Sequence, residues 1–144
     1  ESMTTLNKYA CEVSKNYDVH ACTDVTGFGF LGHLLEMMDN DKSCVIYADK
    51  VPVFEEAKAL ADEFLITAGG QRNRNHVGEK VFFDNIPFSM EEILFDPQTS
   101  GGLMFAVSAD EADSLVEELK KINLPASIVG EIIEKTDVAI KVVK

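Results

Sequence analysis

Apolar residues recur along the chain at two spacings, which predict where helices and strands lie. Apolar residues three or four apart along one face predict helices. The expected helices are 6–17, 28–38, 54–64 and 112–122, with a shorter one beginning at 89–92. Short apolar or alternating runs predict strands. The expected strands are 18–22, 44–48, 81–83, 103–107, 127–133 and 138–143. Helices interleaved with strands indicate an α/β or α+β domain with a mixed sheet.

Local signals set some of the boundaries of these elements. Pro52 precedes the third helix, which fits the tolerance of proline at helix starts. Ser108, followed three residues later by Glu111, predicts a capping box for the last long helix, and Pro125 ends that helix. The last two strands are compatible with a hairpin around 135–137.

The first candidate for chemistry is the junction at 23–29, with the sequence TDVTGFG. It places Asp24 at a strand end and Thr26, Gly27 and Gly29 at a helix start, where free N–H groups suit a phosphate or carboxylate oxygen. The alternative is that Asp24 or Thr26 caps the helix and the glycines only permit tight packing. One Asp cannot hold Mg²⁺ by itself, because magnesium completes its shell with other carboxylates, water and phosphate oxygens.

The second candidate is the loop at 96–102, with the sequence DPQTSGG. Thr99, Ser100, Gly101 and Gly102 could surround an anion with hydroxyl and backbone N–H groups. Asp-Pro and Gly-Gly are also common in ordinary turns, so a structural role is the alternative. The loop is not a P-loop, because it does not match GxxxxGK[ST].

The third candidate is the polar stretch at 69–76, GGQRNRNH, which lacks apolar periodicity. Arg72 and Arg74 could bind a phosphate or a carboxylate bidentately. A solvated, flexible loop is the alternative interpretation. His76 is expected at the surface, and His33 is expected to be packed or hydrogen-bonded, so neither is assigned a catalytic or metal-binding role.

Charge and cysteine content narrow the function classes. A net charge of −12 over 144 residues disfavours nucleic acid as a partner, and an anionic substrate would need a local positive feature or a metal. No apolar run reaches the roughly 18 to 20 residues of a membrane span and no signal pattern is present, so a cytoplasmic protein is expected. Three Cys fit neither a disulfide framework nor a zinc site. We expect reduced thiols, with Cys22 and Cys44 buried in strands.

Two of these segments resemble one enzyme family. Residues 21–34, ACTDVTGFGFLGHL, together with 95–103, FDPQTSGGL, are similar to the selenophosphate synthetases, also called selenide, water dikinases. Gly69-Gly70 with Arg72-Asn73 and the terminal VGEI at 129–132 resemble that family in the same order. The wider family includes aminoimidazole ribonucleotide synthetase, a hydrogenase maturation protein and thiamine-monophosphate kinase, whose matching segments usually diverge from TDVTGFG and DPQTSGG.

The resemblance implies a reaction and a set of site residues. Such enzymes convert ATP, selenide and water into selenophosphate, AMP and orthophosphate, with magnesium. Asp24 matches a magnesium ligand that acts with aspartates of the N-terminal domain. The lower-ranking candidates for cofactor binding are Thr26, Gly27, Gly29, Arg72, Thr99, Ser100, Gly101 and Gly102. No residue of the chain matches the family's reactive Cys or selenocysteine.

The resemblance also implies a fold and an organisation. It predicts a three-layer α/β/α arrangement with a mixed sheet, partly ferredoxin-like. Residues 1–144 would be a single C-terminal domain of a longer enzyme, without the N-terminal ATP-binding domain. The expected partners are that domain, ATP and selenide. The full-length protein is expected to be a homodimer, whereas this fragment could be a monomer, inactive alone and without a tightly bound cofactor.

Two other function classes stay open at this stage. The chain could be the equivalent half of a phosphotransferase that acts on a carbamoyl or ribonucleotide substrate. It could instead be a freestanding α/β interaction module whose glycine loops are tight turns. The coding sequence upstream of Glu1 would separate these classes.

Overall fold

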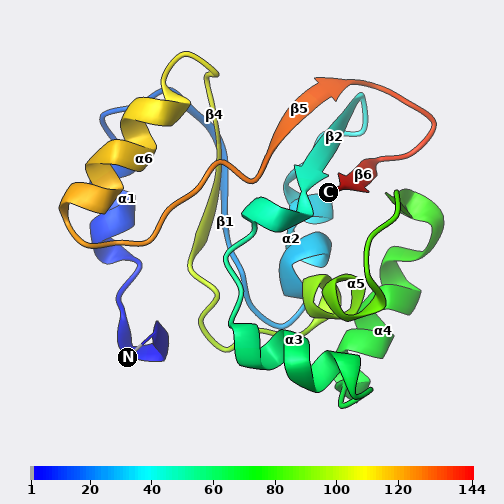
Figure 1. Ribbon diagram of the computed structural model, residues 1–144. Helices are drawn as coiled ribbons and strands as arrows, with labels where there is room; N and C mark the ends of the chain where they lie inside the picture. The colour runs from blue at the N-terminus through cyan, green and yellow to red at the C-terminus, as the bar shows by residue number, and fades with distance from the viewer. Residues whose placement is uncertain (1) are drawn as a thin grey trace.

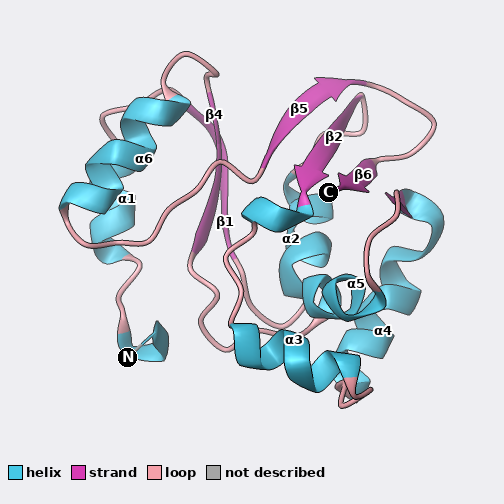
Figure 2. Ribbon diagram, in the orientation of Figure 1, coloured by secondary structure: helices cyan, strands magenta, loops and turns pink. Residues whose placement is uncertain are grey.

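Six strands form two sheets in the computed structural model, which describes residues 2–144. In the smaller sheet, β1 (Val19–Asp24) pairs antiparallel with β4 (Leu103–Val107). The larger sheet has the order β3 (Val81–Phe83), β6 (Ile140–Val143), β2 (Lys42–Tyr47) and β5 (Gly130–Glu134). In it, β5 runs antiparallel to β2, and β6 runs parallel to both β2 and β3. The mixed α/β class expected from the sequence is confirmed (Figure 2).

The helices lie beside both sheets (Figure 1). The α-helices of residues 2–144 are α1 (Lys8–Ser14), α2 (Gly29–Met37), α3 (Glu55–Asp62), α4 (Ala68–Val77), α5 (Phe88–Phe95) and α6 (Ala112–Lys121). Short 3-10 helices occupy Ser2–Thr4, Ala48–Lys50 and Gly78–Lys80. Figure 1 shows α1 and α6 next to the β1–β4 pair, and α2, α4 and α5 below the larger sheet.

The core lies between the larger sheet and the helices α2, α4 and α5. Alternate residues of β2 and β6 point into it, since side chains in a strand alternate between faces. Cys44 and Ile140, paired in register, are 1% and 0% exposed. They pack in one cluster with Leu31 of α2, Val77 of α4 and Phe95 of α5. Each such apolar side chain contributes about 1.5–3 kcal/mol on burial, so this cluster holds the candidate segments in place.

The last two strands do not form a hairpin. They flank β2 on opposite sides, with Cys44 opposite Ile132 on one side and opposite Ile140 on the other. The hydroxyl of Ser43 donates to the carbonyl of Val138 at 2.7 Å and accepts the N–H of Thr136 at 3.0 Å. These bonds hold the β5–β6 connection across the end of β2. The two strands are therefore separated by β2 and cannot pair with each other in a hairpin.

The predicted capping box is also wrong. The N-cap of α6 is Glu111, whose side chain makes no capping bond. Instead, the hydroxyl of Ser108 donates to Asp18 Oδ2 at 2.8 Å, and the Glu111 carboxylate accepts the backbone N–H of Asp18 at 2.6 Å. Both side chains therefore link β4 to the segment before β1. The hydroxyl of Ser108 also lowers the pKa of Asp18.

Burial differs from expectation at several apolar positions. Helix α3 forms as predicted, but Phe54, Leu60 and Phe64 on its apolar face are exposed. Ile122, expected on the core face of α6, is 44% exposed because the helix ends before it. Cys22 is exposed rather than buried, since the alternation along β1 turns it outward. All three cysteines are free thiols.

None of the helices in residues 2–144 has the length and apolar character needed to cross a membrane.

Candidate functional site

Asp24 is the last residue of β1 and lies opposite Leu103 of β4. Its carboxylate is exposed and makes no hydrogen bond or ion pair within residues 2–144. The next residue, Val25, is buried and joins this strand end to the 96–102 loop. Its N–H donates to the carbonyl of Gly102 at 3.0 Å, and its carbonyl accepts the N–H of Gly101 at 2.9 Å. The first two candidate segments are therefore hydrogen-bonded neighbours.

Thr26 strengthens the contact between these two segments. Its carbonyl accepts N–H groups from Gly29 at 3.0 Å and from Gln98 at 2.9 Å. The proposed alternative that Asp24 or Thr26 caps the helix is wrong, because the N-cap of α2 is Phe28 and the side chains of Asp24 and Thr26 accept no N–H of that end. The N–H of Phe28 donates instead to His33 Nε2 at 3.4 Å, and the N–H of Gly29 donates to the Thr26 carbonyl.

His33 is packed and hydrogen-bonded, as predicted. It is 8% exposed, and its Nε2 lies 3.1 Å from the hydroxyl of Thr26. Its Nδ1 lies 3.2 Å from Glu36 Oε2. The hydroxyl of Thr26 is therefore occupied by an internal partner, and His33 acts here as a support for the junction.

Gly29 has the strictest steric requirement of the junction. Its φ is +71°, and a Cβ at this position would lie 2.6 Å from the carbonyl oxygen of Phe95. A side chain is excluded both by the backbone conformation and by the contact with the end of α5. Gly27, by contrast, has open space around it.

The 96–102 loop is ordered by its neighbours and exposes two hydroxyls. A Cβ on Gly101 would lie 2.7 Å from the carbonyl oxygen of Val25, so the two backbones touch. Thr99 and Ser100 are exposed, and their side chains make no hydrogen bond within the described part of the chain. These hydroxyls and the carboxylate of Asp24 are consequently free to meet a ligand.

The third candidate segment is a helix, α4 (Ala68–Val77), and the alternative interpretation as a flexible loop is wrong. The hydroxyl of Thr67 caps the helix by accepting the N–H of Gly70 at 2.9 Å, and it donates to Asp96 Oδ1 at 2.7 Å. A Cβ on Gly69 would lie 2.5 Å from Cγ of Pro97. Glycine disfavours helix formation by about 1 kcal/mol relative to alanine. Close packing on Asp96 and Pro97 offsets that cost.

Asn73 of α4 bonds the 23–29 junction and Phe95, the residue before the 96–102 loop, and no local pattern predicted this role. It is 8% exposed, and its amide nitrogen donates to the carbonyls of Gly27 at 3.0 Å and Phe95 at 2.9 Å. In a uniformly polar stretch, the sequence pattern does not distinguish a buried Asn from its exposed neighbours. The similarity of Arg72-Asn73 to the corresponding pair in the family is the indication that the sequence offers for Asn73.

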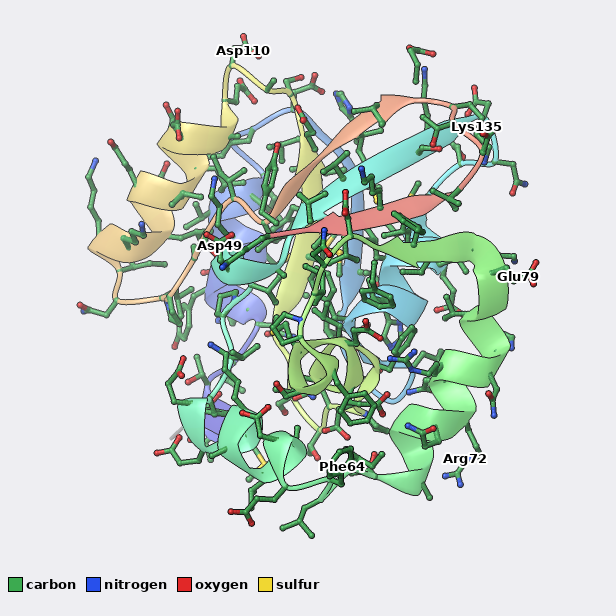
Figure 3. The ribbon with its side chains drawn as sticks, turned by 45° about the vertical axis from the view of Figure 1, so that its right-hand side comes forward. Asp49, Phe64, Arg72, Glu79, Asp110 and Lys135 are labelled. Atoms are coloured by element: carbon green, nitrogen blue, oxygen red, sulfur yellow. The ribbon has the colours of Figure 1, made fainter. Side chains whose placement is uncertain are left out.

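The two arginines of α4 have different surroundings. Arg72 is exposed and points away from the molecule (Figure 3), so the structure does not bring it to the junction. Arg74 is partly buried, and its NH2 group donates to Glu91 Oε2 at 2.5 Å. Its Nε lies 2.9 Å from Glu92 Oε1 but without hydrogen-bond geometry. Arg74 is thus paired with two different carboxylates of α5 rather than with one carboxylate bidentately.

The free groups at the junction fit a magnesium ion only in part. Asp24 offers one exposed carboxylate, and Thr99 and Ser100 offer hydroxyl oxygens, all oxygen donors of the kind magnesium prefers. Within residues 2–144, no three His, Cys, Asp or Glu side chains gather in a way that could hold a metal. Asp24 can therefore be one ligand, and the remaining ligands would have to come from a substrate or from other residues.

Known proteins match the chain over nearly its whole length. Residues 1–143 match the family described as AIR synthase related protein, C-terminal domain. A selenide, water dikinase of Agathobacter rectalis is 61% identical over 98% of this chain and 42% of its own length. One from Desulfitobacterium hafniense is 40% identical over 94% of this chain and 40% of its own. The chain thus spans less than half of these relatives, and its similarity to the selenide, water dikinases is confirmed.

A solved structure supports the fold. The thiamine-monophosphate kinase of Stenotrophomonas maltophilia superposes with a TM-score of 0.52 and 18% identity, over 90% of this chain and 32% of that one. At this identity the likeness concerns the fold alone. With the match of residues 1–143 to the family model, it leads to one assignment. The chain belongs to the AIR synthase related protein family, as its C-terminal domain.

Proposed function

We propose that this chain is the C-terminal domain of an ATP-dependent selenide, water dikinase and helps to close its magnesium–nucleotide site. The observation that carries the proposal is the joining of Asp24 and the 96–102 loop, by bonds from Val25 to Gly101 and Gly102. These two segments carry the family resemblance, and together they expose a carboxylate and two hydroxyls on one junction. The naming of relatives as selenide, water dikinases supports the choice of reaction.

In this proposal the residues of the chain bind and position rather than react. Asp24 would provide one oxygen ligand to Mg²⁺, which when bound offsets the negative charge of phosphate groups. Thr99 and Ser100 would donate hydroxyl hydrogens to phosphate oxygens. Gly27 and Gly102 would keep the backbone accessible, with N–H groups available to an anion. Gly29 and Gly101 would act by allowing close backbone contact, because their N–H groups already donate to the carbonyls of Thr26 and Val25. Thr26 would act indirectly, since His33 and Gln98 occupy its polar groups.

The overall reaction converts ATP, selenide and water into selenophosphate, AMP and orthophosphate. The reactive groups and the main nucleotide ligands would lie outside residues 1–144, in an N-terminal domain. We therefore propose that the isolated chain is inactive, that the full-length protein is a cytoplasmic homodimer, and that neither membrane nor nucleic acid is a partner. Release of AMP from ATP by the purified chain would contradict the first of these statements.

The test substitutes the carboxylate in the full-length protein. We expect Asp24→Asn to reduce selenide-dependent AMP formation strongly and to raise the magnesium concentration needed for half-maximal activity. Asp110→Asn is the matched control, because Asp110 is an exposed aspartate in the turn after β4 (Figure 3). Equal activity and equal magnesium dependence of the two variants would refute the role of Asp24. AMP formation independent of selenide would refute the reaction class.

A further inference from the structure

Large apolar side chains are exposed along α3 and at the start of α5. We call this set the α3–α5 apolar surface: Phe54, Leu60, Phe64, Leu65, Ile66 and Phe88. Phe64 is 73% exposed, and its ring lies 5.3 Å from that of Phe88, centroid to centroid. Figure 3 shows Phe64 at the lower edge of the molecule. Contiguous apolar patches of this kind mark interaction sites in soluble proteins.

The backbone conformation at Phe64 indicates that its side chain serves a purpose other than forming the turn. Helix α3 ends in a Schellman motif, in which Leu65 N–H donates to Leu60 and Phe64 N–H donates to Ala61, both at 3.0 Å. Phe64 takes the left-handed position, with φ +62°. The end of α6 has the same motif with Asn123 at that position, a residue type that tolerates it. A phenylalanine is unfavourable there, so the turn does not explain its presence.

The apolar surface continues into the candidate site. One groove is lined both by apolar residues, among them Ala57, Leu65 and Ile93, and by Thr67, Gly70 and Asp96. Thr67 and Asp96 are the residues that hold α4 against the 96–102 loop. Whatever covers this surface therefore also reaches the candidate site.

Charges on α3 restrict what can cover it. Glu56, Asp62 and Glu63 are exposed and have no ion-pair partner in residues 2–144, whereas Lys58 is paired with Glu55 at 2.8 Å. Two copies of this chain meeting here would bring like charges together. A complementary surface would be apolar with a basic rim.

We propose that the α3–α5 apolar surface is the docking site of a second domain of the same polypeptide, apolar at its centre and basic at its rim. The chain spans 42% and 40% of its two dikinase relatives, so more than half of each lies outside the matched region and is available to supply this domain. The inference rests on the proposed function in taking the chain as part of a longer enzyme. It adds which surface docks, and that docking places the second domain beside Asp96, where the 96–102 loop begins.

Hydroxyl-radical footprinting of the full-length protein tests this without any variant. Each aromatic residue's oxidation rate is divided by its rate in the unfolded protein. In the domain, Phe64 is 73% exposed and Phe82 of β3 is 51% exposed. We expect docking to invert this order, so that Phe64 is oxidised several-fold more slowly than Phe82. Oxidation of Phe64 at least as fast as Phe82 would overturn the proposal.

Two further measurements exclude other occupants. Protection that disappears on dilution to the monomer would overturn the proposal in favour of a second copy. In the full-length Phe64→Gly variant, where glycine suits the left-handed position, we expect the oxidation of Phe54 and Phe88 to rise several-fold. Asn123→Gly is the matched control and should leave both rates unchanged; equal rates in the two variants would overturn the proposal. Footprinting does not require catalytic turnover, so it tests the docking surface even if selenide is not the substrate.

Discussion

The side-chain amide of Asn73 donates to the carbonyl of Phe95 across 2.9 Å, and it also donates to the carbonyl of Gly27 across 3.0 Å. One buried side chain on α4 thereby satisfies carbonyls at the end of α5 and before the start of α2. Buried carbonyls are nearly always paired, and for the Phe95 carbonyl Asn73 supplies that pairing. The geometry of the candidate site therefore depends on a residue that need not touch a ligand.

We expect Asn73→Ala to lower the free energy of unfolding by about 2 kcal/mol, because the buried carbonyl of Phe95 and the more exposed carbonyl of Gly27 lose their donor. Urea unfolding of the purified chain measures the change. Asn75→Ala is the control, since Asn75 is exposed on the same helix and its loss should cost less than about 0.5 kcal/mol. Equal effects of the two substitutions would show that the bridge contributes nothing.

The two glycines of the TDVTGFG junction should respond differently to the same substitution. Gly29→Ala places a Cβ 2.6 Å from the Phe95 carbonyl oxygen at a φ of +71°. We expect a loss of at least about 2 kcal/mol of unfolding free energy from the clash and the strained backbone. Gly27→Ala meets open space and should change the stability by less than about 0.5 kcal/mol. Similar midpoints for both variants in urea would contradict the assignment of Gly29 as the contact point.

The sequence predicted those elements whose stability comes from a local pattern. β4 follows from a short apolar run, and α6 follows from helical spacing around Leu115 and Leu119, both of which are buried. α4 was missed because Gly69 and Gly70 lower the local helix propensity, while the compensating contacts with Pro97 and Asp96 come from far along the chain. The hairpin was wrong for the same reason, since the partner of β6 is β2.

The candidate site was only partly visible in the sequence. The segments containing Asp24 and Gly101 were noticed because they interrupt the apolar pattern, and the structure joins them through Val25. Their contact could not be derived, because strand pairing between β1 and β4 is long-range. Asn73 could not be singled out either, since burial of one polar residue in a polar stretch leaves no local trace.

Substitutions of the two arginines of α4 should distinguish an effect on stability from an effect on ligand binding. Arg74→Gln leaves Glu92, whose side chain is 4% exposed, without its counter-charge. We expect this to cost about 3 kcal/mol of unfolding free energy. Arg72→Gln should cost less than about 0.5 kcal/mol, because Arg72 is exposed.

Kinetics of the full-length Arg72→Gln protein complete this test. If Arg72 binds the nucleotide, the KM for ATP rises while the urea midpoint stays at its original value. An unchanged KM would remove Arg72 from the candidate binding residues. A large stability loss in this variant would contradict its solvent-exposed position.

Cys44 should make the fold sensitive to alkaline pH. The thiol is 1% exposed, and burial raises its pKa to about 12, from 9.0 when unperturbed. Between these values the unfolded chain releases a proton that the folded chain retains, so stability falls as the pH rises. The contribution of Cys44 is intact below pH 9 and is lost progressively up to about pH 12. The greatest slope from one such group is about 1.4 kcal/mol per pH unit.

Comparison with two variants isolates this contribution from that of the tyrosines, because Tyr17 also has its pKa raised to about 12, by its hydrogen bond to Glu118. Unfolding free energies are measured by urea titration across the alkaline range. Cys44→Ala starts from a lower stability because it leaves a small cavity, yet we expect its loss of stability with pH to be shallower than that of the unmodified chain. Cys11→Ala, at an exposed cysteine, should keep the original slope. If Cys44→Ala and the unmodified chain lose stability in parallel, ionisation of the buried thiol does not drive alkaline unfolding.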